Sequence, residues 1–181
     1  YYLATETSTK VDPKGSNAIA LLYDWKRHHP KRYEEVLRLL SQLKLASHVD
    51  AEASLEEILR LDVRPYQHKE LVNLADVGFG ISQILPMLIA DVALPEAGTL
   101  IVNQPEVHLH PSSQALLADY MAARLGARQY IVETHSEYLI NRLRLLVKSE
   151  VVKPEDLDIL YFDVGRTGRH KQYSLSIDLE G

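Results

Sequence analysis

The chain has 181 residues, of which 46% are hydrophobic and 25% charged, with a formal net charge of -5 at pH 7. These values are typical of one globular domain, and the mild acidity argues against indiscriminate nucleic-acid binding. The absence of cysteine excludes disulfide scaffolds, thiolate zinc sites and cysteine nucleophiles. Pro86, Asp91 and Pro95 interrupt the longest apolar stretch, so we expect no membrane partner, and the lack of cysteine favours a cytoplasmic location. The first residue is Tyr1, and we expect the chain to be part of something longer.

Apolar residues at helical spacing dominate the first part of the chain. Ile19, Leu22 and Trp25 predict a helix that begins after Ser16 or Asn17 and ends before Pro30. A second helix is predicted from Pro30 to about residue 43. We therefore interpret residues 1–57 as an N-terminal loop and helical subdomain. A strand over residues 58–65, a turn at 67–68 and a returning strand over 71–74 are expected next.

From residue 77 onward the pattern predicts alternating strands and helices. Residues 77–80 form an irregular glycine-rich turn that leads into an apolar helix over 81–92. Two short apolar strands and two further helices follow, and two strands close the chain as an antiparallel hairpin that ends the sheet. The ranges expected are strands 99–102 and 129–132, helices 111–125 and from 136, and hairpin strands 158–164 and 171–179. Short links between these strands and helices favour a parallel sheet with right-handed crossovers. We predict an α/β fold in which residues 58–181 form one lobe.

Polar residues follow both buried strands at their carboxyl ends, in residues 103–106 and 133–136. In an open parallel sheet, ligands bind at that edge. The glycine-rich turn before Ile81 adds backbone N–H groups at a helix N-terminus, which can hold a phosphate oxygen. The three features together indicate a phosphate-binding region.

In this order the three features resemble the second half of an ABC-type ATPase, in the SMC, RecF and OLD-nuclease branch of P-loop proteins. Residues 76–86, DVGFGISQILP, look like the signature motif found in RecF-like ATPase heads. The segment LIVNQPEVHLHP, residues 100–111, resembles a Walker B strand with the D-loop behind it, and residues 132–136, VETHS, resemble the switch-histidine strand. The closing hairpin is similar to a C-terminal domain of unknown function. The resemblance implies a partial P-loop fold.

The resemblance also implies roles for the turn. In the family, the signature turn of one head closes over the γ-phosphate that is bound to the partner head. ATP-contacting residues would therefore be Gly78, Phe79, Gly80, Ser82 and Gln83. The glycines allow close backbone approach, and the helix dipole favours the anion. A helix N-terminal turn without a ligand is the alternative.

A Walker B strand normally ends in an acid that orients Mg²⁺, followed by a glutamate that polarises the attacking water. The corresponding residues here are Asn103 and Gln104. Asn103 can hold Mg²⁺ only weakly, through a bound water, and Gln104 can orient a water but not accept its proton. Glu106 is then the nearby candidate base, with a non-catalytic carboxylate as the alternative. These departures put ATP hydrolysis in doubt.

His135 would be the switch histidine that contacts the γ-phosphate or the attacking water, unless it is a buried histidine bonded to a backbone carbonyl. Glu133 beside it can support the Mg²⁺ shell or orient His135. A rival hypothesis uses Glu106, His108, His110 and His135 as ligands of zinc or manganese in a metal-dependent hydrolase.

No G-x-x-x-x-G-K-[ST] motif occurs in the sequence, and residues 12–16 only superficially echo it. The resemblance therefore implies an N-terminal ATPase lobe outside this chain as a partner, and a homodimer when the head is complete. We expect an ATPase with ATP and Mg²⁺ as cofactors, inactive as the chain alone. DNA repair or phage defence, with a DNA or nuclease partner, is the expected process. The second hypothesis is a degenerate module that binds nucleotide and dimerises without turnover.

Overall fold

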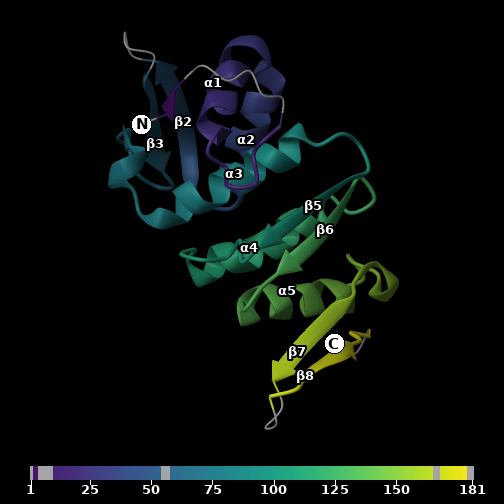
Figure 1. Cartoon of the computed structure of the whole chain (residues 1–181). Helices are drawn as coiled ribbons and strands as arrows, with labels where there is room; N and C mark the ends of the chain where they lie inside the picture. Colours follow the sequence, from purple (N-terminus) through teal and green to yellow (C-terminus); the bar gives the residue numbers. More distant parts are fainter. Residues whose placement is uncertain (1, 4–9, 54–57, 165–167, 179–181) are drawn as a thin grey trace.

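A computed structural model describes residues 2–3, 10–53, 58–164 and 168–178 of the chain. The first two helices form where the apolar spacing predicts them, as α1 (Ala18–His28) and α2 (Pro30–Gln42) (Figure 1). Pro30 lies at the start of α2, where its missing N–H costs no hydrogen bond. Both helices bury their apolar faces, including Trp25 and Leu40.

A strand that the sequence did not predict follows α2. Strand β2 (Ala46–Ala53) pairs antiparallel with β3 (Ile58–Pro65), and β3 also pairs with the short strands β1 (Tyr2–Leu3) and β4 (Val72–Asn73). Helices α1 and α2 pack against β2. The first part of the chain thus contains the two predicted helices, and β2 is an additional strand that packs against them. The predicted division at residues 57 and 58 stays a prediction, although β2 and β3 pair across it.

Helix α3 (Phe79–Ala93) packs against α1, α2 and the strand that follows it. It begins two residues earlier than expected, because Phe79 and Gly80 are helical and only Gly78 lies outside as the N-cap. Its apolar residues, among them Ile84 and Leu88, are fully buried. The short 3₁₀ helix η1 (Leu74–Asp76) precedes this start.

The loop over residues 12–16, which superficially echoes a phosphate loop, has a structural role. The Asp12 carboxylate accepts hydrogen bonds from the backbone N–H groups of Lys14 at 2.7 Å and Ser16 at 3.2 Å. Gly15 has a φ of 72°, and a Cβ there would lie 2.6 Å from Cβ of Pro86 on α3. Because only glycine fits this close approach, the turn serves to pack the N-terminal loop on α3.

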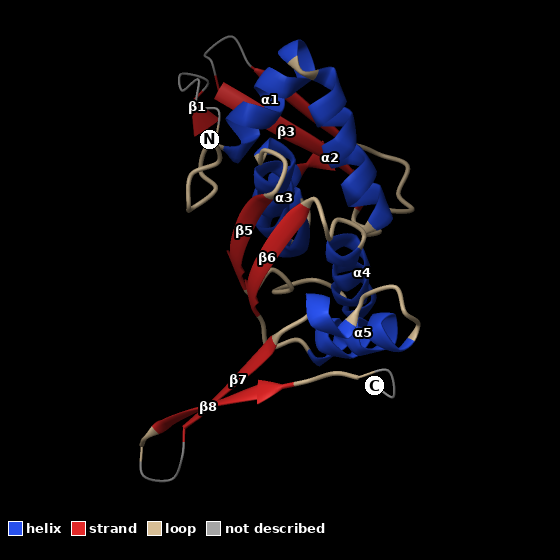
Figure 2. Cartoon of the chain, turned by 90° about the vertical axis from the view of Figure 1, so that its right-hand side faces the viewer, coloured by secondary structure: helices blue, strands red, loops and turns tan. Residues whose placement is uncertain are grey.

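The predicted parallel strands are β5 (Gly98–Asn103) and β6 (Arg128–Glu133), with helices α4 (Pro111–Ala122) and α5 (Glu137–Lys148). The 3₁₀ helix η2 (Pro154–Asp156) leads to the antiparallel hairpin of β7 (Ile159–Val164) and β8 (His170–Leu175). Figure 2 shows this hairpin extending away from the helices. Within the described residues it pairs only with itself, so the expectation that it ends the β5–β6 sheet was wrong. Residues 165–167 and 179 of the predicted hairpin lie outside the described residues.

The β5–β6 sheet is covered on one face only. Leu100 is buried, and Val102, Tyr130 and Val132 pack against the core. On the opposite face the side chains of Ile101 and Ile131 are 72% and 52% exposed. Parallel sheets are normally covered on both faces, so this face lacks the layer that such sheets require. None of the described helices is long and apolar enough to cross a lipid bilayer.

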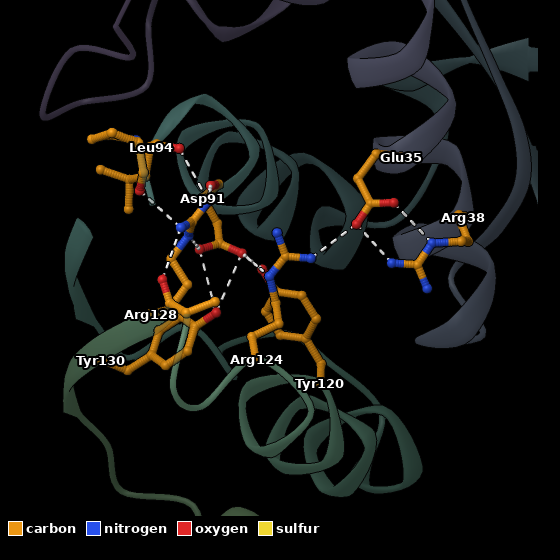
Figure 3. A network of polar contacts seen from close by, with 10 residues as sticks. Glu35, Arg38, Asp91, Leu94, Tyr120, Arg124, Arg128 and Tyr130 are labelled. Carbon is orange, nitrogen blue, oxygen red and sulfur yellow. Dashed lines mark hydrogen bonds and ion pairs between the residues drawn. The ribbon is translucent and has the colours of Figure 1, made fainter. Parts of the chain in front are cut away.

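A buried polar cluster joins α3 to three neighbouring elements (Figure 3). The Asp91 carboxylate on α3 is fully buried and accepts hydrogen bonds from the hydroxyls of Tyr120 on α4 and Tyr130 on β6. Its oxygens lie 2.8 Å from Nε of Arg124 and 3.4 Å from Nε of Arg128. Burial, and then the Asp91 charge, raise the pKa of both tyrosines, which stay neutral donors. The cluster therefore compensates a charge within the core.

The same cluster reaches the first part of the chain through Arg124. Its Nη1 atom lies 2.9 Å from Oε1 of Glu35 on α2, and that oxygen is also 2.6 Å from Nη2 of Arg38. The Arg38 hydrogen bond, followed by that of Arg124, lowers the pKa of Glu35. One continuous network thus links α2, α3, α4 and β6.

Candidate functional site

The glycine turn, residues 78–82, presents the N-terminus of α3 to solvent. No side chain caps this terminus at Gly78, and a Cβ added there would meet nothing within 4 Å. Phe79 is 71% exposed, Gln83 is exposed, and the Ser82 hydroxyl donates to the carbonyl oxygen of Phe79 at 2.8 Å. The first N–H groups of a 15-residue helix are therefore accessible, as anion binding requires.

Gly80, the second glycine of the turn, has a packing role. A Cβ added to Gly80 would lie 2.8 Å from the carbonyl oxygen of His108, in the loop that follows β5. The rings of Phe79 and His108 pack beside this contact with centroids 5.6 Å apart. The glycine turn is therefore fixed against residues 103–110, which we call the β5 loop.

We expect Gly80→Ala to lower the free energy of unfolding by about 2–3 kcal/mol, because the new methyl group overpacks a backbone carbonyl. The matched control is Gly78→Ala, which meets no atom and loses only a favourable N-cap residue, at a cost below about 1 kcal/mol. Urea denaturation of both variants measures the difference. Equal stability of the two variants would contradict this prediction, because it would mean that the β5 loop moves at little cost to accommodate a methyl group at residue 80.

The β5 loop has an unusual backbone. Gln104 and His108 have φ values of 45° and 62°, in the left-handed region that non-glycine residues adopt at a cost of about 1–2 kcal/mol. The Gln104 N–H donates to the carbonyl oxygen of Glu133 at 2.7 Å, which ties the loop to the end of β6. Such strained residues occur at functional sites, where surrounding contacts hold them.

Glu106, the sequence-predicted base, is buried with 5% exposure. Its Oε1 atom accepts a hydrogen bond from the backbone N–H of His135 at 2.9 Å, and Oε2 is buried without a partner among the described residues. A carboxylate held inside the protein by a backbone N–H is poorly placed to take a proton from a water at the surface. This geometry favours a role for Glu106 in positioning the segment that carries His135.

The side chain of His135 is exposed at the carboxyl end of β6, which contradicts the alternative of a buried histidine. The next residue, Ser136, caps α5 by accepting from the N–H of Leu139 at 3.0 Å and donates to Gln114 at 2.6 Å. Gln114 in turn donates to the carbonyl oxygen of Leu109 in the β5 loop at 2.9 Å. The His135 segment and the β5 loop are therefore joined at two places.

The rival metal site is not formed. His108 packs on Phe79, Nδ1 of His110 lies 2.8 Å from the Ser112 hydroxyl, and Glu106 is held by a backbone N–H. Among the described residues no group of three or more His, Asp or Glu side chains is arranged to hold a metal ion. In this structure the four residues of the zinc or manganese hypothesis therefore do not come together as metal ligands.

Asn103 and Glu133 lie side by side where β5 and β6 end. They are directly paired in the parallel register, and Nδ2 of Asn103 donates to Oε2 of Glu133 at 2.6 Å. Both are exposed on the open face of the sheet that carries Ile101 and Ile131. Their carboxylate and amide oxygens are the hard ligands that Mg²⁺ takes together with phosphate oxygens, so the donor set fits this metal.

Two parts of this arrangement were not predicted from the sequence. The contact of His108 with the glycine turn had no sequence signal, because the loop turns back at two non-glycine residues. The Asp91 cluster did have a sequence signal, since Asp91 is the single charged residue of the apolar helix α3. A lone carboxylate in such a helix indicates buried cationic partners.

Solved structures of SMC ATPase heads share the fold of this chain. An SMC ATPase described for ATP-driven dimerization and DNA-stimulated activation is 19% identical, with a TM-score of 0.54 over 83% of this chain and 88% of that chain. An Smc head bound to the C-winged helix domain of ScpA is 13% identical, with a TM-score of 0.60 over 96% of this chain and 53% of that one. A search of curated proteins found no match.

A third structure, the Smc head domain with a coiled coil and joint from Pyrococcus yayanosii, is 14% identical, with a TM-score of 0.57 over 86% of this chain. The present chain spans 28% of that structure's length and 53% of the ScpA-bound head. At these identities the matches show the fold, which is that of SMC ATPase heads.

The model of the AAA ATPase domain family matches residues 4–140. This range contains the glycine turn, the β5 loop and the His135 segment, and the chain belongs to this family of ATPase domains. The resemblance that the three motifs indicated is confirmed at the level of family and fold.

Proposed function

We propose that this chain forms one lobe of an ATPase head that binds ATP between two copies of the complete head. The observation that carries the proposal is the direct packing of three motifs. The glycine turn contacts the β5 loop at His108, and the β5 loop contacts the His135 segment through Glu106. Features separated by up to 57 residues in the sequence thus form one surface at the carboxyl end of β5 and β6, where α/β proteins bind ligands.

The open face of the β5–β6 sheet supports a second lobe as the partner. Ile101 and Ile131 lie in the middle of this face, and the polar pair of Asn103 and Glu133 lies at its carboxyl end. An added layer would bury the apolar residues and bring its own groups next to the polar ones. The sequence contains no lysine-bearing phosphate loop, and the partner lobe would supply it.

In this proposal each residue has a chemical task. The N–H groups of α3 after Gly78 would donate to phosphate oxygens of the ATP held by the opposite head, and the Ser82 hydroxyl would join them by turning away from the Phe79 carbonyl oxygen. Gln104 orients the attacking water from its strained turn, and His135 donates to the γ-phosphate or to that water. Mg²⁺, when bound, would neutralise charge that develops on the phosphates.

A non-hydrolysing module is the second candidate, and a specific observation favours it. Asn103 and Gln104 carry no carboxylate, while Glu106 is buried and engaged with the His135 N–H. Among Asn103, Gln104, Glu106 and Glu133, only Glu133 has an exposed carboxylate, and a carboxylate is a weak base. Such a head would dimerise with ATP but turn over slowly or not at all. We also propose a DNA-linked process, such as repair or phage defence. This proposal is based on the shared fold with SMC heads, one of which is described for DNA-stimulated activation.

We expect the 181-residue chain alone to show no measurable ATPase activity, because it has no phosphate-loop lysine. The full-length protein is expected to bind ATP and to dimerise when ATP is present. Equilibrium binding of a fluorescent ATP analogue, with analytical ultracentrifugation, measures both properties. Gly78→Ala leaves the packing of the chain intact, and we expect it to weaken ATP-dependent dimerisation because its methyl group would stand between the helix N-terminus and the phosphate.

Robust turnover by the chain alone would contradict this proposal, as would a full-length protein that binds no nucleotide. Nucleotide-dependent dimerisation without turnover would select the non-hydrolysing module. Detectable turnover at millimolar Mg²⁺ would select the ATPase.

A further inference from the structure

We infer that Glu133 supplies the metal-binding carboxylate of this head from β6, in place of the acid that a Walker B strand would carry at residue 103. This inference rests on the proposed function and concerns the same edge of the sheet. The sequence alone suggested a weakened metal site, because Asn103 has no charge. The structure shows a negative charge at the same place, contributed by the neighbouring strand.

The first observation is the register of the two strands. Asn103 and Glu133 are the last residues of β5 and β6 and face each other directly in the parallel pairing. Both side chains lie on the open face. A carboxylate at residue 133 could therefore reach nearly the same metal position as a carboxylate at residue 103. Moving the charge across one strand spacing of about 4.8 Å therefore keeps it at the edge that binds ligands.

The second observation is the orientation of the pair. Nδ2 of Asn103 donates to Oε2 of Glu133 at 2.6 Å, which directs the amide nitrogen toward the carboxylate. Among the described residues no hydrogen bond occupies Oε1 of Glu133 or Oδ1 of Asn103, and no cationic side chain pairs with Glu133. One carboxylate oxygen and one amide oxygen thus remain as adjacent hard ligands. Mg²⁺ is commonly held by one or two such protein groups together with phosphates and waters.

The third observation concerns the alternatives for that charge. Glu106 is a second carboxylate near the site, and it is buried and held by the N–H of His135. The N–H of Gln104 donates to the Glu133 carbonyl oxygen at 2.7 Å, so the backbone of Glu133 is fixed to the loop that carries the water-orienting residue. Glu133 is therefore an exposed carboxylate whose position is set by two hydrogen bonds from the β5 side.

The test uses the full-length protein, a non-hydrolysable ATP analogue and Mn²⁺ as the probe for the Mg²⁺ site, with bound Mn²⁺ measured by electron paramagnetic resonance. Glu133→Gln keeps the size of the side chain and its acceptor oxygen for Asn103 but removes the charge. We expect this variant to lose on the order of tenfold to 100-fold in Mn²⁺ affinity. Nucleotide affinity in EDTA is expected to stay within about threefold, because that measurement contains no metal.

Two further variants sharpen the test. The double variant Asn103→Asp with Glu133→Gln returns the carboxylate to β5 and is expected to restore Mn²⁺ affinity to within about threefold of the parent. Glu137→Gln removes another exposed carboxylate, four residues along the chain, and is expected to leave Mn²⁺ affinity unchanged. Restoration by the double variant would show that the metal is held by the negative charge, and that the loss in Glu133→Gln is not caused by a change in protein structure.

Unchanged Mn²⁺ affinity in Glu133→Gln would overturn this inference while leaving the proposed ATP-binding function intact. Failure of the parent protein to bind the ATP analogue in EDTA would instead overturn the proposed function. The two failures therefore appear in different measurements.

Discussion

Replacing Asp91 with alanine is expected to lower the free energy of unfolding of this chain by about 3–5 kcal/mol, the cost of breaking a buried ion pair from one side. Asp91 is fully buried, and the side chains of Arg124 and Arg128 beside it are only 19% and 10% exposed. Without the carboxylate these two cations lose their shared counter-ion, and Tyr120 and Tyr130 lose their acceptor. Urea denaturation monitored by the fluorescence of Trp25 measures the loss.

The matched control is Asp119→Ala on α4, which also removes a carboxylate bonded to an arginine. Its partner Arg142 lies 2.7 Å away, but the side chains are 31% and 39% exposed. Exposed pairs contribute about 0–1 kcal/mol, because water solvates both charges when the pair is broken. Similar losses in the two variants would mean that water reaches Asp91 and that the cluster is not a desolvated network.

The position of the cluster gives this prediction a functional consequence. Asp91 lies on the helix that begins at the glycine turn, and Tyr130 lies on the strand that ends at Glu133. Arg124 continues the network to Glu35 on α2. The cluster thus holds the ends of α3 and β6 that lie away from the proposed site. We therefore expect Asp91→Ala to shift the site residues at the other ends of α3 and β6, although Asp91 does not contact them.

Local patterns were sufficient to predict the helices and most of the strands. The apolar spacing of α1, α2 and α5 and the β-branched residues of β5 and β6 each indicate their structure over a few turns or residues. Strand β2 was missed because its polar residues, such as His48, Asp50 and Glu52, give a weak apolar signal. Its stability comes from pairing with β3 and from the packing of α1 and α2, which the local sequence does not contain.

The candidate site divides in the same way. Its motifs follow from residue types at strand and helix ends, and so the sequence predicted Gln104, His135 and the glycine turn as neighbours. The contacts between the motifs could not be predicted, because they require a left-handed backbone at Gln104 and His108. Neither residue is a glycine, so the sequence does not indicate a turn there. The burial of Glu106, and hence its positioning role, follows from that loop conformation.

The double substitution Ile101→Lys and Ile131→Lys is expected to have little effect in the chain and a large effect in the full-length protein. In the chain both side chains are exposed, at 72% and 52%, and the free energy of unfolding should change by less than about 1 kcal/mol in total. In the full-length protein the proposed second lobe covers this face, and each buried ammonium without a partner costs several kcal/mol.

We therefore expect the full-length double variant to lose on the order of 100-fold or more in affinity for the ATP analogue, because each 1.4 kcal/mol corresponds to a tenfold change. Leu145→Lys is the matched control, since Leu145 is 55% exposed on α5 and away from the open face. It should leave nucleotide affinity unchanged.

If the lysines at 101 and 131 leave ATP binding intact in the full-length protein, the open face stays in contact with water there, and the second lobe must join the chain elsewhere. The free edges of β6 and β7 would then be the next surface to test, because within the described residues β6 pairs only with β5, and β7 only with β8. A proline at a residue of β7 whose N–H points away from β8 would block pairing on that edge, whereas Ile101→Lys and Ile131→Lys act on the face of the sheet, so the two sets of variants distinguish face packing from strand addition.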